Sequence, residues 1–135
     1  MSTELFFTTL TALLAASLWI PYIIGVNKHE YEGKETAFLR PPNHAHMPAW
    51  VHRAFRAHMN LLEQFLPFAV LVVIGHLMGV QSVWLGYMAA AFFTLRLVHA
   101  VGMIGGWARM PLRPLVFTTG YAITMAYGTI VLMNA

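Results

Sequence analysis

The chain has 135 residues, of which 59% are hydrophobic and only 10% are charged. Soluble domains carry about 25% charged residues, so this composition argues against a water-soluble globular domain and against intrinsic disorder. The length fits one domain, residues 1–135, and the lack of cysteine rules out disulfides and a cysteine nucleophile in the chain itself.

The first apolar stretch, residues 5–26, carries no charge and is long enough to cross a bilayer, which takes about 20 residues. No lysine or arginine precedes it, so we predict a membrane span rather than a signal peptide. Pro21 is expected to bend or end its last turns, because proline lacks the amide hydrogen that a helix uses. The polar segment 27–48 that follows is predicted to be a loop.

Three further apolar stretches follow along the chain, at residues 49–78, 82–103 and 115–133. A turn at residues 79–81 separates the first two, and a loop at residues 104–113 containing glycine and proline separates the last two. We therefore predict an all-α fold, an integral membrane four-helix bundle.

The basic residues indicate how this bundle is oriented. Four spans place both chain ends on one side, and all eight lysines and arginines lie in or beside the two loops of the other side. Cytoplasmic loops are rich in these residues, so the loops are predicted to be cytoplasmic and the termini non-cytoplasmic. Membrane orientation therefore explains the excess of basic residues that gives the chain its net charge of +3. We predict no nucleic-acid binding. The eight residues are Lys28, Lys34, Arg40, Arg53, Arg56, Arg96, Arg109 and Arg113.

Glu63 and Arg96 are the most informative charged residues, and both lie within predicted spans. A charge at the centre of a bilayer costs about 2.5–3.5 kcal/mol, so such residues usually have polar partners and often mark a functional site. Two structural alternatives stay open: Arg96 extends to the membrane interface, or Glu63 forms an ion pair inside the bundle.

The neighbours of Glu63 favour a functional site. On a helix, Arg56, Asn60 and Glu63 fall within an arc of about 60°, which His52 and Arg53 extend toward the cytoplasmic end. Arginines bind carboxylates through two hydrogen bonds, and a glutamate binds an ammonium group. These charges suit a zwitterionic ligand with several carboxylates, such as glutathione, and an arginine beside its sulfur would stabilise the reactive thiolate. The third span and the loop after it add Arg96, His99, Arg109 and Arg113.

Three motifs resemble those of the MAPEG superfamily, the membrane-associated proteins in eicosanoid and glutathione metabolism. The first is RAFRAHMNLLEQFLPF at residues 53–68, which contains the pattern Arg-Ala-x-x-Asn-x-x-Glu-x-x-x-Pro from Arg56 to Pro67. The second is RLVH at residues 96–99, and the third is RMPLR at residues 109–113. They stand in the order of the family and lie in or beside three of the four spans.

The resemblance implies a homotrimer that binds glutathione, as a co-substrate, between subunits on the cytoplasmic side. By motif position, Arg56, Asn60, Glu63 and His99 would contact glutathione, Arg96 would support the site, and Arg113 would activate the thiol. We include Arg109 among the ligand-binding residues. The implied function is a glutathione transferase or peroxidase that acts on a hydrophobic small-molecule substrate, a lipophilic electrophile reaching the site through the membrane lipids.

The sequence departs from the eicosanoid-synthesising members at three positions. Met59 stands where they have a second arginine, and Met103 and Phe117 stand where they have tyrosines. These changes argue against prostaglandin or leukotriene synthesis and favour the bacterial branch, which implies a bacterial inner membrane. They also keep open a non-catalytic lipid-binding or partner-binding trimer, whereas a proton or ion conduit rests only on Glu63 and Arg96.

The chain is also rich in histidine, but we predict no metal site. His44 and His46 lie close together in the polar loop, with His52 and His58 nearby. Histidine pairs bind zinc or copper in many proteins, but no spacing here is diagnostic of such a site.

Overall fold

The computed structural model describes residues 1–31, 33–36, 39 and 46–134, and all of the regular structure in them is helical. Arg40 and His44 therefore lie outside the described residues. The elements are α1 (Thr3–Ser17), α2 (Trp19–Lys28), the 3-10 turn η1 (Lys34–Thr36), α3 (Ala49–Leu77), α4 (Val83–Gly105) and α5 (Leu112–Met133).

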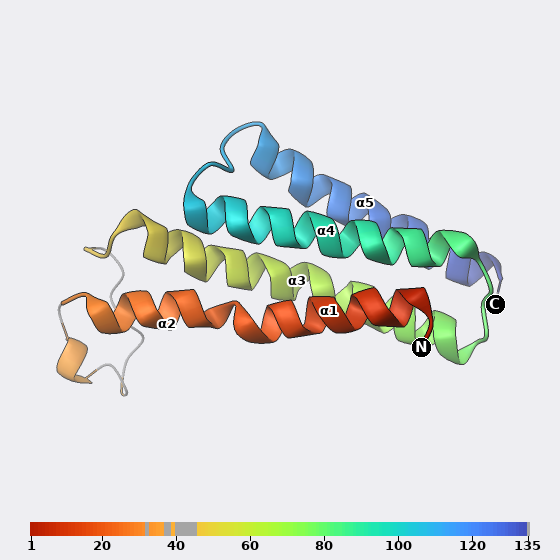
Figure 1. Ribbon diagram of the computed structural model, residues 1–135, viewed down its shortest axis with the longest axis horizontal. Helices are drawn as coiled ribbons and strands as arrows, with labels where there is room; N and C mark the ends of the chain where they lie inside the picture. The colour runs from red at the N-terminus through yellow and green to blue at the C-terminus, as the bar shows by residue number, and fades with distance from the viewer. Residues whose placement is uncertain (32, 37–38, 40–45, 135) are drawn as a thin grey trace.

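The prediction of four helices long enough to span a membrane is confirmed. Helices α1 and α2 follow one another along nearly the same line (Figure 1) and together form one apolar span, Thr3–Lys28, beside those of α3, α4 and α5. The break between them, at Leu18, follows from Pro21, because its ring lacks an amide hydrogen and crowds the carbonyl of Ser17. The helix resumes and runs through Pro21, so the proline interrupts this span without ending it.

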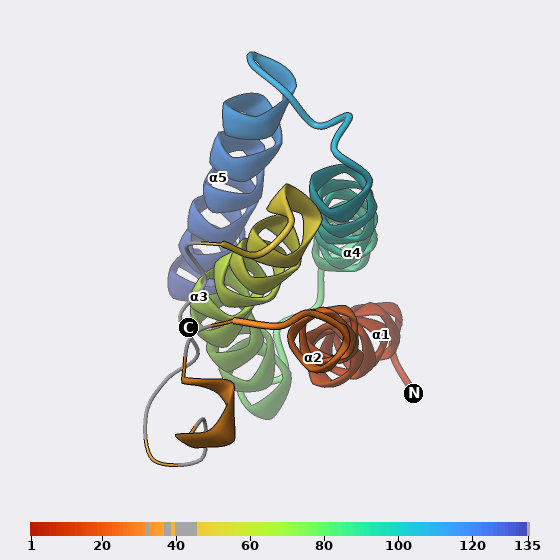
Figure 2. The same cartoon turned by 90° about the vertical axis from the view of Figure 1, so that its left-hand side faces the viewer.

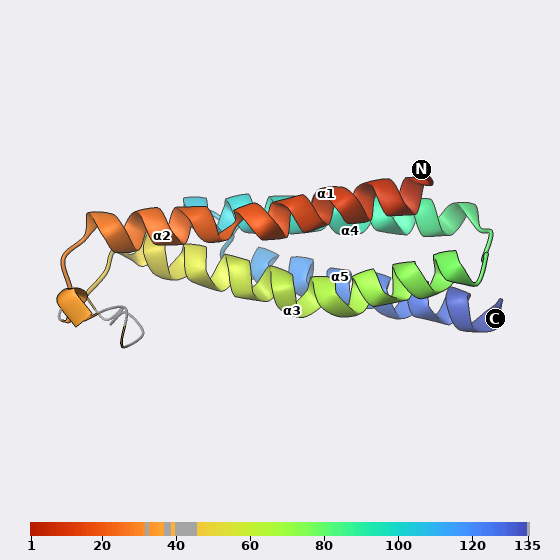
Figure 3. The same ribbon diagram turned by 90° about the horizontal axis from the view of Figure 1, so that it is seen from below.

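The helices run lengthwise beside one another, with both chain ends and the α3–α4 turn at one end (Figures 1 and 3). Segment η1 and the α4–α5 loop lie toward the other end. Viewed along the bundle, α3 lies between α5 on one side and the α1–α2 rod on the other (Figure 2). Helix α5 packs against α3 and α4, so these three helices form one corner of the molecule.

The interior of this corner is apolar and closely packed. The Phe68 and Phe92 rings of α3 and α4 stack with their centroids 4.1 Å apart, and Tyr127 of α5 meets Phe68 edge-on at 5.3 Å. All three side chains are fully buried. This cluster fixes how α3, α4 and α5 lie against one another, and α3 and α4 also bury three polar side chains, those of Gln64, Arg96 and His99.

Candidate functional site

A pocket of about 380 Å³ lies between α3, α4 and the start of α5. Small-molecule sites usually enclose roughly 300–1,000 Å³, so this pocket lies at the lower end of that range. Four of the predicted site residues meet there, from motifs far apart in the sequence: Arg56, Asn60, His99 and Arg113. The remaining lining residues are Met110, Pro114, Phe117 and Thr118.

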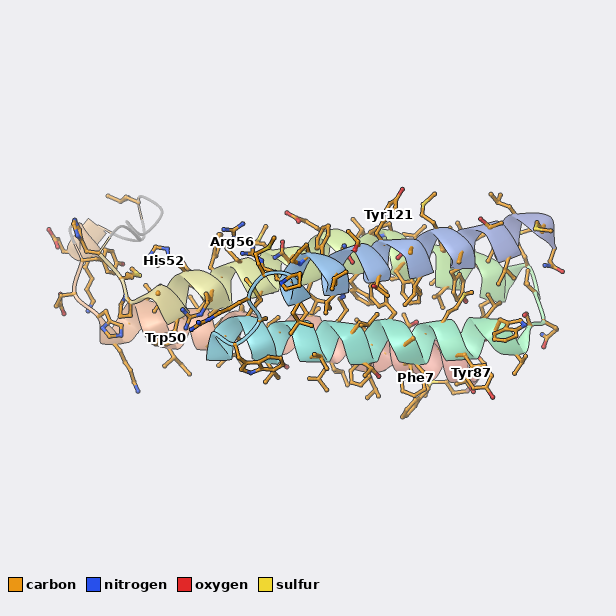
Figure 4. The ribbon with its side chains drawn as sticks, turned by 90° about the horizontal axis from the view of Figure 1, so that it is seen from above. Phe7, Trp50, His52, Arg56, Tyr87 and Tyr121 are labelled. Atoms are coloured by element: carbon orange, nitrogen blue, oxygen red, sulfur yellow. The ribbon has the colours of Figure 1, made fainter. Side chains whose placement is uncertain are left out.

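The pocket opens on the outer face of the α3–α5 corner. Arg56 is exposed, and it points outward on the side of the molecule where Tyr121 projects from α5 (Figure 4). Phe7 and Tyr87 point away from the opposite side. A ligand in this pocket would therefore be in contact with whatever covers the outer face of α3 and α5.

The pocket is positively charged. Arg56 and Arg113 line it from opposite helices, and none of its lining residues is acidic. His99 is only 3% exposed, and its Nε2 has no hydrogen-bond partner among the described residues. Two guanidinium groups and an imidazole suit a ligand with carboxylates, because arginine binds carboxylates through paired hydrogen bonds.

Glu63 does not line this pocket. It lies at the middle of α3, is exposed, and lines a second pocket of about 220 Å³ with Pro67, Tyr121 and three other residues. Phe117 borders both pockets. Glu63 forms no ion pair with any residue that the structure describes, so the alternative of a Glu63 ion pair inside the bundle is not found among them. A carboxylate at this depth needs a polar partner, and the outward position of Glu63 leaves that partner to come from outside the subunit.

Arg96 lies behind the pocket, in the interior. It is 1% exposed, and its Nη2 donates a hydrogen bond to the Val116 carbonyl of α5 at 2.8 Å. Its guanidinium carbon lies 5.5 Å from the centre of the Phe92 ring. The alternative in which Arg96 extends to the interface is therefore not realised, because the side chain turns toward α5 instead.

Two other arginines lie outside the pocket. Arg109 is exposed, and its Nε donates to the Gly106 carbonyl at 3.4 Å within its own loop. Arg53 was expected to extend the polar arc of α3. That expectation is wrong, because Arg53 donates to the Met103 and Ile104 carbonyls at 2.8 and 3.3 Å. These carbonyls belong to the last turn of α4, where cations are favoured, so Arg53 joins α3 to α4.

The structure adds polar residues that the motifs did not single out. Gln64 is buried, and its Nε2 donates to the Phe117 carbonyl of α5 at 3.1 Å. An amide within an apolar span was the available signal, because it needs partners there. Nothing comparable in the sequence indicated that Met110, Pro114 and Thr118 line the pocket. No group of three histidine or acidic residues within metal-binding reach occurs among the described residues.

The comparisons with known proteins agree with the three motifs. The model of the MAPEG family matches residues 6–133, nearly the whole chain. Neither the curated proteins nor the solved structures contain a significant match. The chain therefore belongs to the MAPEG family, as its motifs predicted.

Proposed function

We propose that this member of the MAPEG family is a glutathione-dependent transferase or peroxidase that acts on lipophilic electrophiles inside a membrane. The observation that carries the proposal is the pocket that gathers Arg56, Asn60, His99 and Arg113 from three helices. These are four of the residues that the family motifs assign to glutathione, and they meet although Arg56 and Arg113 are 57 positions apart in the sequence.

The chemistry of the pocket fits glutathione, which has two carboxylates, one amine and one thiol. Arg56 bonds a carboxylate, Asn60 offers an amide to the peptide groups, and His99 presents a buried nitrogen that no described residue binds. Glu63 binds the amine from the neighbouring pocket. Its outward position supports a ligand held at the boundary between subunits of a homotrimer, where a second copy covers Glu63.

Arg113 has the central role in the proposed reaction. Its guanidinium lies beside the sulfur and stabilises the thiolate left when the thiol proton passes to water. A lone pair of the thiolate then attacks the electrophilic carbon, the carbon–sulfur bond forms, and the leaving group departs with its bonding electrons. The apolar Phe117, which borders both pockets, lies where the electrophile would approach from the lipid.

One observation favours a second candidate, a non-catalytic lipid-binding or partner-binding trimer. Met59 and Phe117 stand where eicosanoid-synthesising members have arginine and tyrosine, and both side chains are more than a third exposed. Phe117 makes the pocket more apolar and Met59 adds an apolar side chain to the exposed face of α3, which suits an acyl chain as well as an electrophile.

The experiment is conjugation of glutathione to chlorodinitrobenzene by the purified protein in lipid nanodiscs. We expect Arg113→Ala to lower the rate about 100-fold, as the loss of one charge-stabilising group does in other enzymes. Lys28→Ala is the matched control, because Lys28 is an exposed cation at the end of α2 and should leave the rate unchanged. Equal rates in the wild type and Arg113→Ala would overturn the role of Arg113. Absence of activity together with fatty-acid binding would favour the second candidate.

A further inference from the structure

Two buried side chains, one from α3 and one from α4, bind the same stretch of α5. Gln64 Nε2 donates to the Phe117 carbonyl at 3.1 Å, and Arg96 Nη2 donates to the Val116 carbonyl at 2.8 Å. Gln64 is 8% exposed and Arg96 is 1% exposed. The adjacent carbonyls of Val116 and Phe117 thus accept hydrogen bonds from two different helices, α4 and α3.

The backbone of α5 lies directly on these two side chains at Gly120. A Cβ atom added there would lie 2.6 Å from Gln64 Oε1 and 3.0 Å from Arg96 Cζ. Both distances are shorter than ordinary van der Waals contacts, so only glycine allows α5 to approach this closely. Polar bonds between helices, rather than apolar packing alone, therefore set the position of α5 here.

These bonds lie one helical turn from Arg113, and the Phe117 that accepts one of them itself lines the pocket. Arg113 precedes Val116 by three residues and Phe117 by four, so it lies one turn closer to the start of α5. No side chain caps that start, which follows directly on the α4–α5 loop. Among the described residues, the bonds from Gln64 and Arg96 are thus the side-chain hydrogen bonds from other helices that reach α5 nearest to Arg113.

We propose that Gln64 and Arg96 are positioning residues, which hold the first turns of α5 and thereby place the Arg113 guanidinium in the pocket opposite Arg56 and Asn60. Gln64 and Arg96 act through Arg113. The consequence for the reaction rests on the proposed function, whereas the placement of α5 does not.

The first experiment tests the placement without glutathione. Because the chain has no cysteine, a spin label can be attached at Leu115→Cys, in the first turns of α5, or at Leu132→Cys, near its far end. Both leucines are exposed, at 57% and 78%. We expect Gln64→Met, which removes the donor but keeps the length, to make the label at position 115 more mobile and to leave the label at 132 unchanged.

Arg96→Lys, which keeps the charge but shortens the reach, should act in the same way. Thr11→Val is the control, because Thr11 is fully buried and bonds only the Phe7 carbonyl of its own helix. It should leave both labels unchanged. Unchanged mobility at position 115 in both α5-contact variants, or equal loosening at 115 and 132, would overturn the proposal.

The second experiment separates positioning from general stability by a double-mutant cycle of the conjugation rate. In the wild-type background we expect Gln64→Met to lower kcat about tenfold, because small misplacements of a catalytic group are costly. In the Arg113→Ala background, Gln64→Met should have no further effect. Equal losses in both backgrounds would show that Gln64 does not act through Arg113. If the wild type had no activity, the label measurements would still decide the placement of α5.

Discussion

Glu63 and Arg96, two charged residues of the membrane-spanning helices, have opposite environments. Arg96 is enclosed by α4 and α5, where the Val116 carbonyl accepts its hydrogen bond. Glu63 faces outward from the middle of α3. Their sequence positions indicated that each needs a polar partner, but the partner depends on how the helices are rotated against one another, which a single span does not encode.

The outward position of Glu63 leads to a prediction about ligand recognition. We expect Glu63→Gln to weaken glutathione binding by about 10–100-fold, the value of a charge-assisted hydrogen bond of roughly 1.5–3 kcal/mol. Binding of a glutathione analogue without the α-amino group should be almost unchanged by the substitution. Calorimetry on both ligands measures this, with Glu35→Gln as a control at an exposed carboxylate of η1. An equal loss of affinity for both ligands would show that Glu63 does not bind the amine.

Much of the candidate site could be predicted at the residue scale. The motifs singled out Arg56, Asn60, His99 and Arg113, and the structure brings them into one pocket. Gln64 was missed because the motifs mark residues by type and spacing, whereas its role depends on a carbonyl of another helix, 53 residues away. Arg53 was misassigned for a related reason. Its angular position on α3 suited the polar arc, but the free carbonyls at the end of α4 lie within its reach.

At the element scale, hydropathy predicted the spans well because a membrane helix must be continuously apolar over its whole length. The beginning of α5 was harder to predict. The loop was expected to extend to residue 113, but α5 begins at Leu112 and includes Pro114. Proline is tolerated there because the amide hydrogens of the first helical turn have no acceptor within the helix.

The close approach of α5 to α3 and α4 leads to a prediction about stability. We expect Gly120→Ala to destabilise the protein by about 1–3 kcal/mol, the usual cost of overpacking, because the new methyl group meets Gln64 and Arg96. Gly128→Ala is the matched control on the same helix. Its methyl group would lie 3.2 Å from the end of the flexible Leu71 side chain, so it should cost less. Thermal unfolding in detergent compares the two, and equal shifts in Tm would contradict this packing.

At the scale of the whole molecule, different segments of the chain lie at the two ends of the bundle. The chain termini and the α3–α4 turn share one end, and η1 and the α4–α5 loop lie toward the other (Figure 1). The order of four spans implied this arrangement, since each span reverses direction. The side chains that face outward are largely apolar, which is the surface that lipid or another subunit requires.

The distribution of basic residues leads to a prediction about orientation. We expect a membrane-impermeant maleimide to label Ser2→Cys, Gln81→Cys and Asn134→Cys in intact bacterial cells whose outer membrane has been permeabilised. Glu35→Cys should be labelled only after lysis, because the basic loops are expected to be cytoplasmic. The wild-type chain, which has no cysteine, supplies an unlabelled background. The reverse pattern would place the candidate site on the other side of the membrane.

The central claim is that the pocket of Arg56, Asn60, His99 and Arg113 binds glutathione and that Arg113 stabilises its thiolate. The most direct measurement is the ultraviolet difference spectrum of glutathione added to the protein at neutral pH, with calorimetry on the same samples. We expect thiolate absorption with the wild-type protein, and none with Arg113→Ala although glutathione still binds. Failure of the wild-type protein to bind glutathione, or equal thiolate absorption in both proteins, would contradict the claim.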